Sequence, residues 1–333
     1  MSFLALKNPR EASVMAALTV GMVMAPFFFP QLLQQLTMLW LMVVFALTWD
    51  MTGGQMGYNS FGNVLFFGIG AYAGVMVQRE AGFDYHTGFV VGVLAATVLA
   101  GVVAMVLGVG MLGLRGHYFA IGTLGLGIAA GELAGAWDLI GAGSGLTSPL
   151  YPADAAHGRS AGDGGQFFYW WMAGLAVVCF WVSRALYRTR FGLALNAIRD
   201  DEDKAEALGL PTTSIKIFAW SLSACLLGAA GAIAGNVIGF IDPKDVAFAG
   251  ATFGVWMVLM AILGGKGTLW GPVLGAVIFH LTQELFWTYL LGWQRVALGL
   301  FIISIVVFFP EGILGSLRTR FPALFGVRVE ERS

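Results

Sequence analysis

The sequence predicts an all-α, polytopic membrane protein with about ten transmembrane helices. Of its 333 residues, 58% are hydrophobic and only 11% are charged, whereas soluble domains average about 25% charged residues. The hydrophobic residues form long runs, and a helix needs about 20 mostly apolar residues to cross a bilayer. The net charge of −1 provides no basic field for nucleic acid. These observations exclude an ordinary soluble protein and a nucleic-acid-binding protein.

The apolar runs divide the chain into spans and connecting loops. The predicted spans cover about residues 13–30, 32–49, 60–78, 88–112, 118–140, 167–187, 215–239, 251–264, 270–290 and 294–310. They form one transmembrane domain over residues 1–333, with a cytoplasmic loop at 188–214. The third, fifth and ninth runs are rich in glycine, which predicts broken or re-entrant helices lying inside protein or beside water. Cys179 and Cys225 each lie in an apolar run, so we expect buried thiols and no disulfide.

The positions of the basic residues predict the orientation in the membrane. With ten spans, both termini lie on one side, together with most of the 18 Lys and Arg residues. The exceptions are Arg79, Arg159, Lys244 and Arg295. Cytoplasmic loops carry the excess of basic residues in multi-pass proteins. We therefore expect both termini, and the loop at 188–214, to be cytoplasmic.

The densest charge in the sequence lies between two apolar runs, from Arg184 to Ala219. Within it, apolar residues recur at roughly helical spacing, namely Leu193, Ala197, Ile198, Ala205 and Leu208. Gly209 and Pro211 then stop the helix. We predict a single amphipathic helix, Leu193–Gly209, that presents Ala197, Ala205 and the acidic residues Asp200, Asp201 and Glu202 to a groove on a partner. The alternative is a solvated loop that only orients the protein.

At this stretch the chain resembles a known family. The matching residues are Phe191, Gly192, Ala197–Asp200, Glu202, Ala205, Ala207–Gly209, Lys216 and Ala219. They are similar to the cytoplasmic loop of bacterial branched-chain amino acid ABC importer permeases of the LivM type. The resemblance implies a type II ABC importer-like permease whose loop is a coupling helix on an ATPase subunit. It assigns the coupling contact to Gly192, Ala197, Arg199, Asp200, Glu202, Ala205 and Gly209.

A second stretch, Gly54–Tyr72, brings polar residues into an apolar setting. Its glycines allow close helix approach or a kinked backbone. It resembles the family's first pore motif at Gly54, Gly57, Ser60, Gly62, Phe66, Gly68, Gly70, Ala71 and Tyr72, and departs from it at Tyr58 and Asn63. The stretch Gly116–Leu124 matches the family as well. Together they imply a translocation path lined by Ser60, Gly62, Asn63, Tyr72 and Thr123, with helix packing by small residues as the alternative.

Ionisable residues inside predicted spans are further candidates. Glu132 falls within the span 118–140, and a carboxylate at a helix centre costs about 2.5–3.5 kcal/mol to insert, so we expect it to face the bundle interior and the path. It would bind the ammonium of an amino acid or act as a hydrogen-bonded structural group. His280 and Glu284 share one helix face and form either a structural pair or a proton relay.

The run Gly264–Pro272 resembles the family's second glycine-rich motif and, superficially, a phosphate-binding loop. The phosphate-loop pattern requires glycine at position 260 and Ser or Thr at 267, where Met260 and Gly267 stand. We therefore expect a transport subunit that is not an enzyme and holds no cofactor, with ATP bound on partner subunits. Glycine-rich stretches in both halves, around 54–72 and 253–276, are compatible with an inverted repeat.

The resemblance implies a modular importer in the bacterial inner membrane. Its other parts would be ABC ATPase subunits, a second, LivH-like permease and a periplasmic substrate-binding protein, besides the membrane lipid. The outer segment 147–166 would receive the binding protein or remain a plain solvated loop. The substrate would be a branched-chain or related small amino acid, with urea and short amides as alternatives. The rivals are a proton-coupled secondary transporter using Glu132, His280 or Glu284, and a scaffold or channel.

Overall fold

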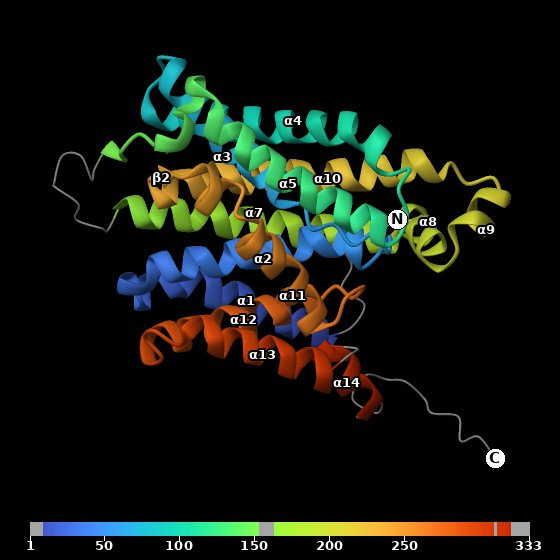
Figure 1. The fold of residues 1–333 in the computed structure, drawn as a ribbon. Coiled ribbons are helices and arrows are strands. Elements are labelled where there is room, and N and C mark those ends of the chain that lie inside the picture. The colour runs from blue at the N-terminus through green and yellow to red at the C-terminus, as the bar shows by residue number, and fades with distance from the viewer. Residues whose placement is uncertain (1–8, 153–162, 310–311, 321–333) are drawn as a thin grey trace.

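A computed structural model describes residues 9–152, 163–309 and 312–320 of the chain (Figure 1). The long helices are α1 (Pro9–Phe28), α2 (Leu33–Gly53), α3 (Val64–Glu80), α4 (Tyr85–Met111), α5 (His117–Ala136), α7 (Asp163–Arg188), α10 (Thr212–Ile238), α12 (Gly271–Tyr289) and α13 (Gln294–Phe308). The shorter elements are η1 (Pro30–Leu32), η2 (Asp138–Ile140), η3 (Ala142–Ser144), α8 (Arg190–Asp200), α9 (Glu202–Ala207), η4 (Pro243–Ala247), η5 (Gly250–Gly254), α11 (Val255–Gly264) and α14 (Gly312–Arg320). The fold is therefore helical, as expected.

Within the described residues, six helical stretches are long and apolar enough to cross a membrane. They are Pro30–Gly53, Tyr85–Met111, His117–Ala136, Gly164–Arg188, Thr212–Ile238 and Pro243–Gly264. Each of the other predicted spans also contains a helix, namely α1, α3, α12 and α13. These four are shorter or less apolar, so the number of crossings stays a prediction. Residues 153–162 of the predicted outer segment, and both chain ends, lie outside the described residues.

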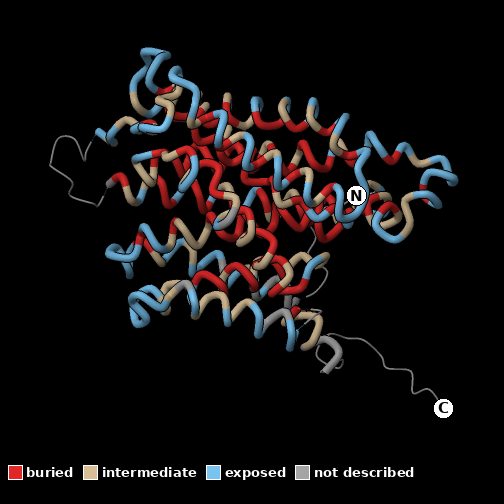
Figure 2. The backbone as a smooth tube through the Cα atoms, in the orientation of Figure 1, coloured by how far each residue is buried: buried red, intermediate tan, exposed pale blue. Residues whose placement is uncertain are grey.

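The helix α10 occupies the centre of the bundle. In its most apolar part, 78% of the residues are buried, against 28% in α4. Small residues at the contacts, such as Gly70 of α3, Gly228 of α10 and Ala96 of α4, let these helix backbones approach closely. Figure 2 shows the buried residues concentrated along α2, α3 and α10. The exposed apolar side chains of α4, such as Val102 and Val106, suit contact with lipid.

The two ends of the bundle are built differently (Figure 1). At one end lie α8, α9 and the link between α4 and α5. At the other end, β1 (Leu146–Thr147) pairs antiparallel with β2 (Phe240–Ile241), in the register Leu146 with Ile241. We call these the α8–α9 end and the β1–β2 end.

The three glycine-rich runs predicted to be broken or re-entrant each contain one continuous helix: α3 in the run 60–78, α5 in the run 118–140 and α12 in the run 270–290. The prediction of broken helices is therefore wrong. Irregular backbone lies next to two of them instead, at residues 54–63 before α3 and at the 3-10 turn η2 after α5. The ninth run is the most regular of the three. Its glycines Gly271 and Gly275 serve close packing on the backbone of residues 260–265 instead. Cys179 and Cys225 are free thiols, as expected.

Candidate coupling and translocation sites

The charged loop forms two helices, α8 and α9, rather than the single helix Leu193–Gly209, so that prediction is wrong. The break is at Asp201, whose backbone is extended (φ −165°, ψ 103°). Its carboxylate accepts a hydrogen bond from the backbone N–H of Lys204 at 3.0 Å and so caps the N-terminus of α9. Hydrogen bonds from Lys204 lower the pKa of Asp201, which keeps the capping group ionised. The helix restarts because Asp201 satisfies a free N–H at this end.

The predicted coupling residues divide into an exposed and an inward-facing set. Asp200 and Gly209 are exposed, Arg199 is 39% exposed at its side chain, and Ala197 is half-buried. Gly192 and Ala205 are buried, and the side chain of Glu202 is only 11% exposed. The expectation that Ala205 and Glu202 face a partner is wrong, because α9 turns both towards its own chain. The large apolar side chains left exposed are Leu193 at 69% and Leu208 at 84%.

Glu202 lies in a buried ionic cluster with Lys216 of α10. The ammonium of Lys216 donates to Glu202 Oε1 at 2.6 Å, to the carbonyl oxygen of Leu112 at 2.7 Å and to Tyr58 Oη at 3.0 Å. Tyr58 in turn donates its hydroxyl hydrogen to Glu202 Oε2. Burial first, and then the hydrogen bond to Glu202, raises the pKa of Tyr58 far above its usual range. The phenol therefore stays protonated and remains a donor.

A second buried polar cluster surrounds Asp50, a residue that the sequence analysis did not single out. Asp50 is fully buried at the end of α2. Its carboxylate accepts hydrogen bonds from Tyr187 Oη of α7 at 2.5 Å and from the N–H of Gly267 at 2.7 Å. Gln55 donates to the carbonyl oxygen of Gly267 at 2.9 Å. Asp50 thus joins α2 and α7 to the glycine-rich link between α11 and α12. The sequence signal was one acidic residue directly after the predicted span 32–49.

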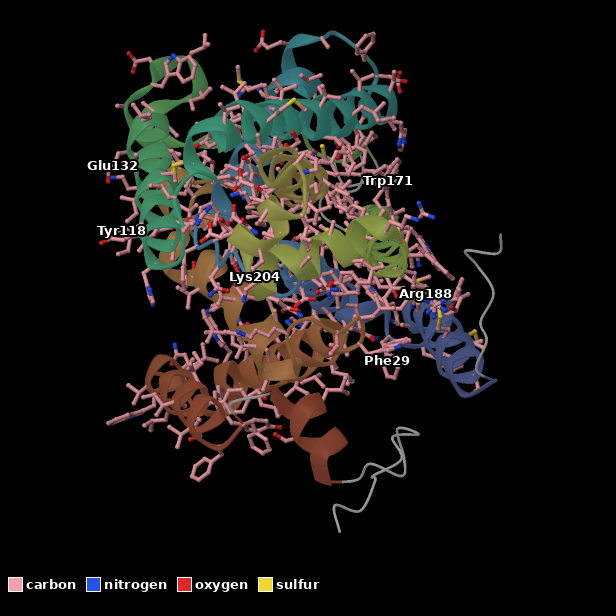
Figure 3. The ribbon with its side chains drawn as sticks, turned by 90° about the vertical axis from the view of Figure 1, so that its right-hand side faces the viewer. Phe29, Tyr118, Glu132, Trp171, Arg188 and Lys204 are labelled. Carbon is pink, nitrogen blue, oxygen red and sulfur yellow. The ribbon has the colours of Figure 1, made fainter. Side chains whose placement is uncertain are left out.

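Arg199 connects α8 to the non-helical residues that follow Asp50. Its guanidinium donates to the carbonyl oxygen of Gly54 at 3.4 Å and pairs with Asp200 at 3.2 Å. Its aliphatic part packs against Gly57. The turn that leaves α2 is therefore in contact with both α8 and, through Tyr58, α9. Figure 3 looks onto this end of the molecule, with Lys204 of α9 labelled.

Several predicted path residues come together where α3 begins. A Cβ added at Gly62 would lie 2.1 Å from the carbonyl oxygen of Thr123, so only glycine permits this approach to α5. The N–H of Phe61 donates to Thr123 Oγ1 at 3.2 Å. Trp49 donates its ring N–H to the carbonyl oxygen of Ser60 at 2.7 Å. Ser60, Gly62 and Thr123 therefore lie at one junction between α2, α3 and α5.

Polar side chains at this junction are buried without partners. Among the described residues, Ser60 Oγ, both amide atoms of Asn63 and Tyr72 Oη have no hydrogen-bond partner. Ser60 and Asn63 are at most 1% exposed. Further along α3, the ring of Tyr72 stacks on Phe248 with a centroid distance of 6.1 Å. Unpaired buried polar groups are costly, and they mark places where water or a solute is expected to bind.

Glu132 does not face the interior as expected. The helix α5 ends at Ala136, so Glu132 lies near its C-terminal end rather than at mid-span. Its side chain is 64% exposed and pairs with Lys244 of η4 at 2.8 Å. Figure 3 shows Glu132 and Tyr118 on the outer side of α5. The expectation failed because Glu132 lies on the exposed face of α5, where Lys244 of η4 pairs with its carboxylate.

His280 lies on α12 and is 4% exposed. Among the described residues, its Nδ1 has no hydrogen-bond partner. The helix α12 packs against α2 and α11.

The comparison with known proteins agrees with this architecture. A model of the family described as branched-chain amino acid transport system, permease component, matches residues 31–309. The chain belongs to this family. The resemblance inferred from the sequence is thereby confirmed, and the chain is a multi-pass membrane permease of a transport system.

Relatives with curated names include permeases for different solutes. The high-affinity branched-chain amino acid transport permease LivM of Salmonella typhimurium is 27% identical over 303 residues, which cover 85% of this chain and 69% of the relative. The autoinducer 2 import permease LsrC of Yersinia pseudotuberculosis is 32% identical over 148 residues, covering 41% of this chain and 40% of the relative. The probable LivH of Methanocaldococcus jannaschii is 27% identical over 138 residues, covering 39% and 42%. No solved structure matches the chain.

Proposed function

We propose that this protein is a transmembrane permease subunit of an ABC importer in a bacterial inner membrane. In this proposal the chain crosses the membrane about ten times, with both termini in the cytoplasm. Separate ATPase subunits supply the energy, and a LivH-like second permease and a periplasmic substrate-binding protein complete the importer. The family match over residues 31–309 carries the proposal. The inverted repeat remains part of the same proposal.

The proposed docking surface for the ATPases is the exposed part of α8 and α9. It comprises the apolar side chains Leu193 and Leu208, the partly exposed Arg199, and the acidic Asp200 and Asp203. Exposed leucines outside the apolar runs suit a groove on a partner, and the charges around them suit its rim. Nucleotide-driven movement of this surface would switch the bundle between outward and inward access.

The proposed substrate is a branched-chain or related small amino acid. The junction of α3 and α5 offers hydroxyl and amide groups from Ser60, Asn63 and Thr123. These groups carry no charge, so they suit neutral polar solutes as well. Urea or a short amide is the second candidate, and the relatives named as autoinducer 2 import permeases support a substrate outside the branched-chain amino acids.

Transport by the complete complex tests the proposal. The chain is purified from its host membrane through an affinity tag, together with its bound subunits, and reconstituted in vesicles. We expect uptake of radiolabelled leucine that requires both ATP and binding protein. Uptake that persists without ATP under a proton gradient would establish the secondary transporter instead. Flux through this chain alone, without ATP or a gradient, would establish the channel.

A docking test follows from Leu208, which is 84% exposed on the α8–α9 end. Leu208→Glu is expected to release the ATPase from the purified complex and to abolish ATP-driven uptake, because a charge would then face the apolar groove. The matched control is Leu139→Glu in η2, near the β1–β2 end, where Leu139 is 69% exposed. The control is expected to retain the ATPase. Equal retention of the ATPase by both variants would contradict docking at Leu208.

A second test concerns water access to the junction of α3 and α5. In a background lacking Cys179 and Cys225, Ser60→Cys and Thr123→Cys are expected to react with a water-soluble thiol reagent. Reaction requires the thiolate, which forms only at a wetted site. The rate is measured without nucleotide and with trapped ATP, and it is expected to differ between the two states. Full protection of both cysteines in both states would remove these residues from the path.

A further inference from the structure

The clearest structural link between the α8–α9 end and the membrane helices is at Glu202. Four separate segments meet there: α9 through Glu202, α10 through Lys216, the α4–α5 link through Leu112 and Arg115, and residues 54–63 through Tyr58. Each contact joins residues that are distant in the sequence. A movement of α9 therefore acts on all three other segments at once.

The ammonium of Lys216 at the centre of the cluster has no donor left for an outside partner. The side chain of Lys216 is 3% exposed, and its three N–H donors meet the three acceptors of Glu202, Leu112 and Tyr58. The ammonium also lies 4.8 Å from the centroid of the Tyr58 ring. Moving Glu202 alone would leave a buried charge unpaired, which is strongly unfavourable. Glu202, Lys216 and Tyr58 are therefore expected to move as a unit.

Tyr58 belongs to the segment of this region with no regular helix. Residues 54–63 lie between the end of α2 and the start of α3. One end of the segment contacts Arg199 of α8, and the other end carries Ser60 and Asn63, the buried polar side chains without partners. The body of α3 beyond it is packed closely on α10 and α4 through small residues. The segment 54–63 is thus the non-helical connection between the α8–α9 end and the closely packed body of α3.

We propose that Tyr58 and Lys216 are positioning residues that transmit the movement of α9 to the segment 54–63 and so to the polar side chains of the translocation path. This inference rests on the proposed function. In this proposal Glu202 moves together with α9, and Lys216 ties the cluster to the central helix α10. The hydrogen bond between the Tyr58 hydroxyl and Glu202 then displaces the segment 54–63. Neither Tyr58 nor Lys216 touches the substrate.

The test is Tyr58→Phe in the complete complex in vesicles. The variant removes one hydroxyl but keeps the ion pair of Glu202 with Lys216 and the ring contact with Phe119, whose centroid is 5.1 Å away. Two rates are measured together: ATP hydrolysis stimulated by binding protein, and leucine uptake. We expect hydrolysis within about twofold of the unchanged protein and at least about a fivefold fall in leucine transported per ATP, the lower range of measured site-to-site couplings.

Two controls separate positioning from general stability. Tyr169→Phe removes a hydroxyl that donates to the carbonyl oxygen of Met22 at 2.8 Å, and it is expected to leave the transport-to-ATP ratio unchanged. Arg115→Met removes two contacts with α9, the ion pair with Asp203 at 2.6 Å and the Nε contact to Glu202 at 3.6 Å. Its effect is expected to be small because the Arg115 side chain is half-exposed. If Tyr58→Phe lowers the amount of folded protein, the leucine transported per ATP is measured in Glu202→Gln instead. Glutamine keeps the size of the side chain and one acceptor oxygen.

The outcomes distinguish the inference from the proposed function. An unchanged ratio in Tyr58→Phe, or equal falls of hydrolysis and uptake, would overturn the positioning role. Absence of ATP-driven uptake in the unchanged protein would instead overturn the proposed function. A fall in the ratio restricted to Tyr58→Phe and Glu202→Gln supports the inference.

Discussion

Replacing Asp50 by alanine is expected to lower the free energy of unfolding by about 2–6 kcal/mol. The substitution removes the acceptor of two buried donors, the hydroxyl of Tyr187 and the N–H of Gly267. Leaving a buried donor unsatisfied costs about 1–3 kcal/mol, and here two are affected. The links from α2 to α7 and to the α11–α12 connection would weaken together. Equilibrium unfolding by denaturant in detergent micelles measures the change.

Two variants calibrate this result. Tyr187→Phe removes one of the two hydrogen bonds and is expected to cost less than Asp50→Ala. Asp84→Ala removes an exposed acidic N-cap of α4, whose carboxylate accepts from the N–H of Thr87 at 3.2 Å. A cap of this kind contributes about 0.5–2 kcal/mol. If Asp50→Ala proved no more destabilising than Asp84→Ala, the Asp50 cluster would not be a structural junction.

The second large effect is expected at Gly62. In Gly62→Ala the new Cβ would lie 2.1 Å from the carbonyl oxygen of Thr123, so the segment 54–63 must move away from α5. Overpacking of this kind costs about 1–3 kcal/mol. We expect uptake to fall further than the loss of folded protein explains, because Ser60 and Asn63 would be displaced. The measurement is leucine uptake per amount of folded complex in vesicles.

Gly125 on α5 provides the matched control for Gly62. A Cβ added at Gly125 meets nothing within 4 Å. Because alanine also favours the helix over glycine by about 0.5–1 kcal/mol, Gly125→Ala is expected to be neutral or slightly stabilising. Normal uptake by Gly62→Ala would show that the contact between this segment and α5 is not needed.

The sequence alone was sufficient for the class of protein and for the place of its principal loop. Runs of apolar residues report helices that contact lipid, because the bilayer requires about 20 such residues in succession. The charged stretch around Arg199 could be located between two spans for the same reason, because each apolar run on either side of it is recognisable from neighbouring residues alone. Ser60, Gly62 and Thr123 were singled out as path residues through resemblance to the family rather than through spacing, and their role in the path stays a prediction.

Only the tertiary structure decided which polar residues face inward. Ala205 and Glu202 sit on an amphipathic pattern that suits either an outer partner or the chain's own α10, and the choice depends on Lys216 and Tyr58. Asp50 meets Gly267, and Glu132 meets Lys244, across more than a hundred residues of chain. Such pairings depend on how the helices pack around α10, and the free energy of burying a charge is set by the partner it finds there. Local patterns report the periodicity of each helix, whereas these partners are fixed by long-range packing.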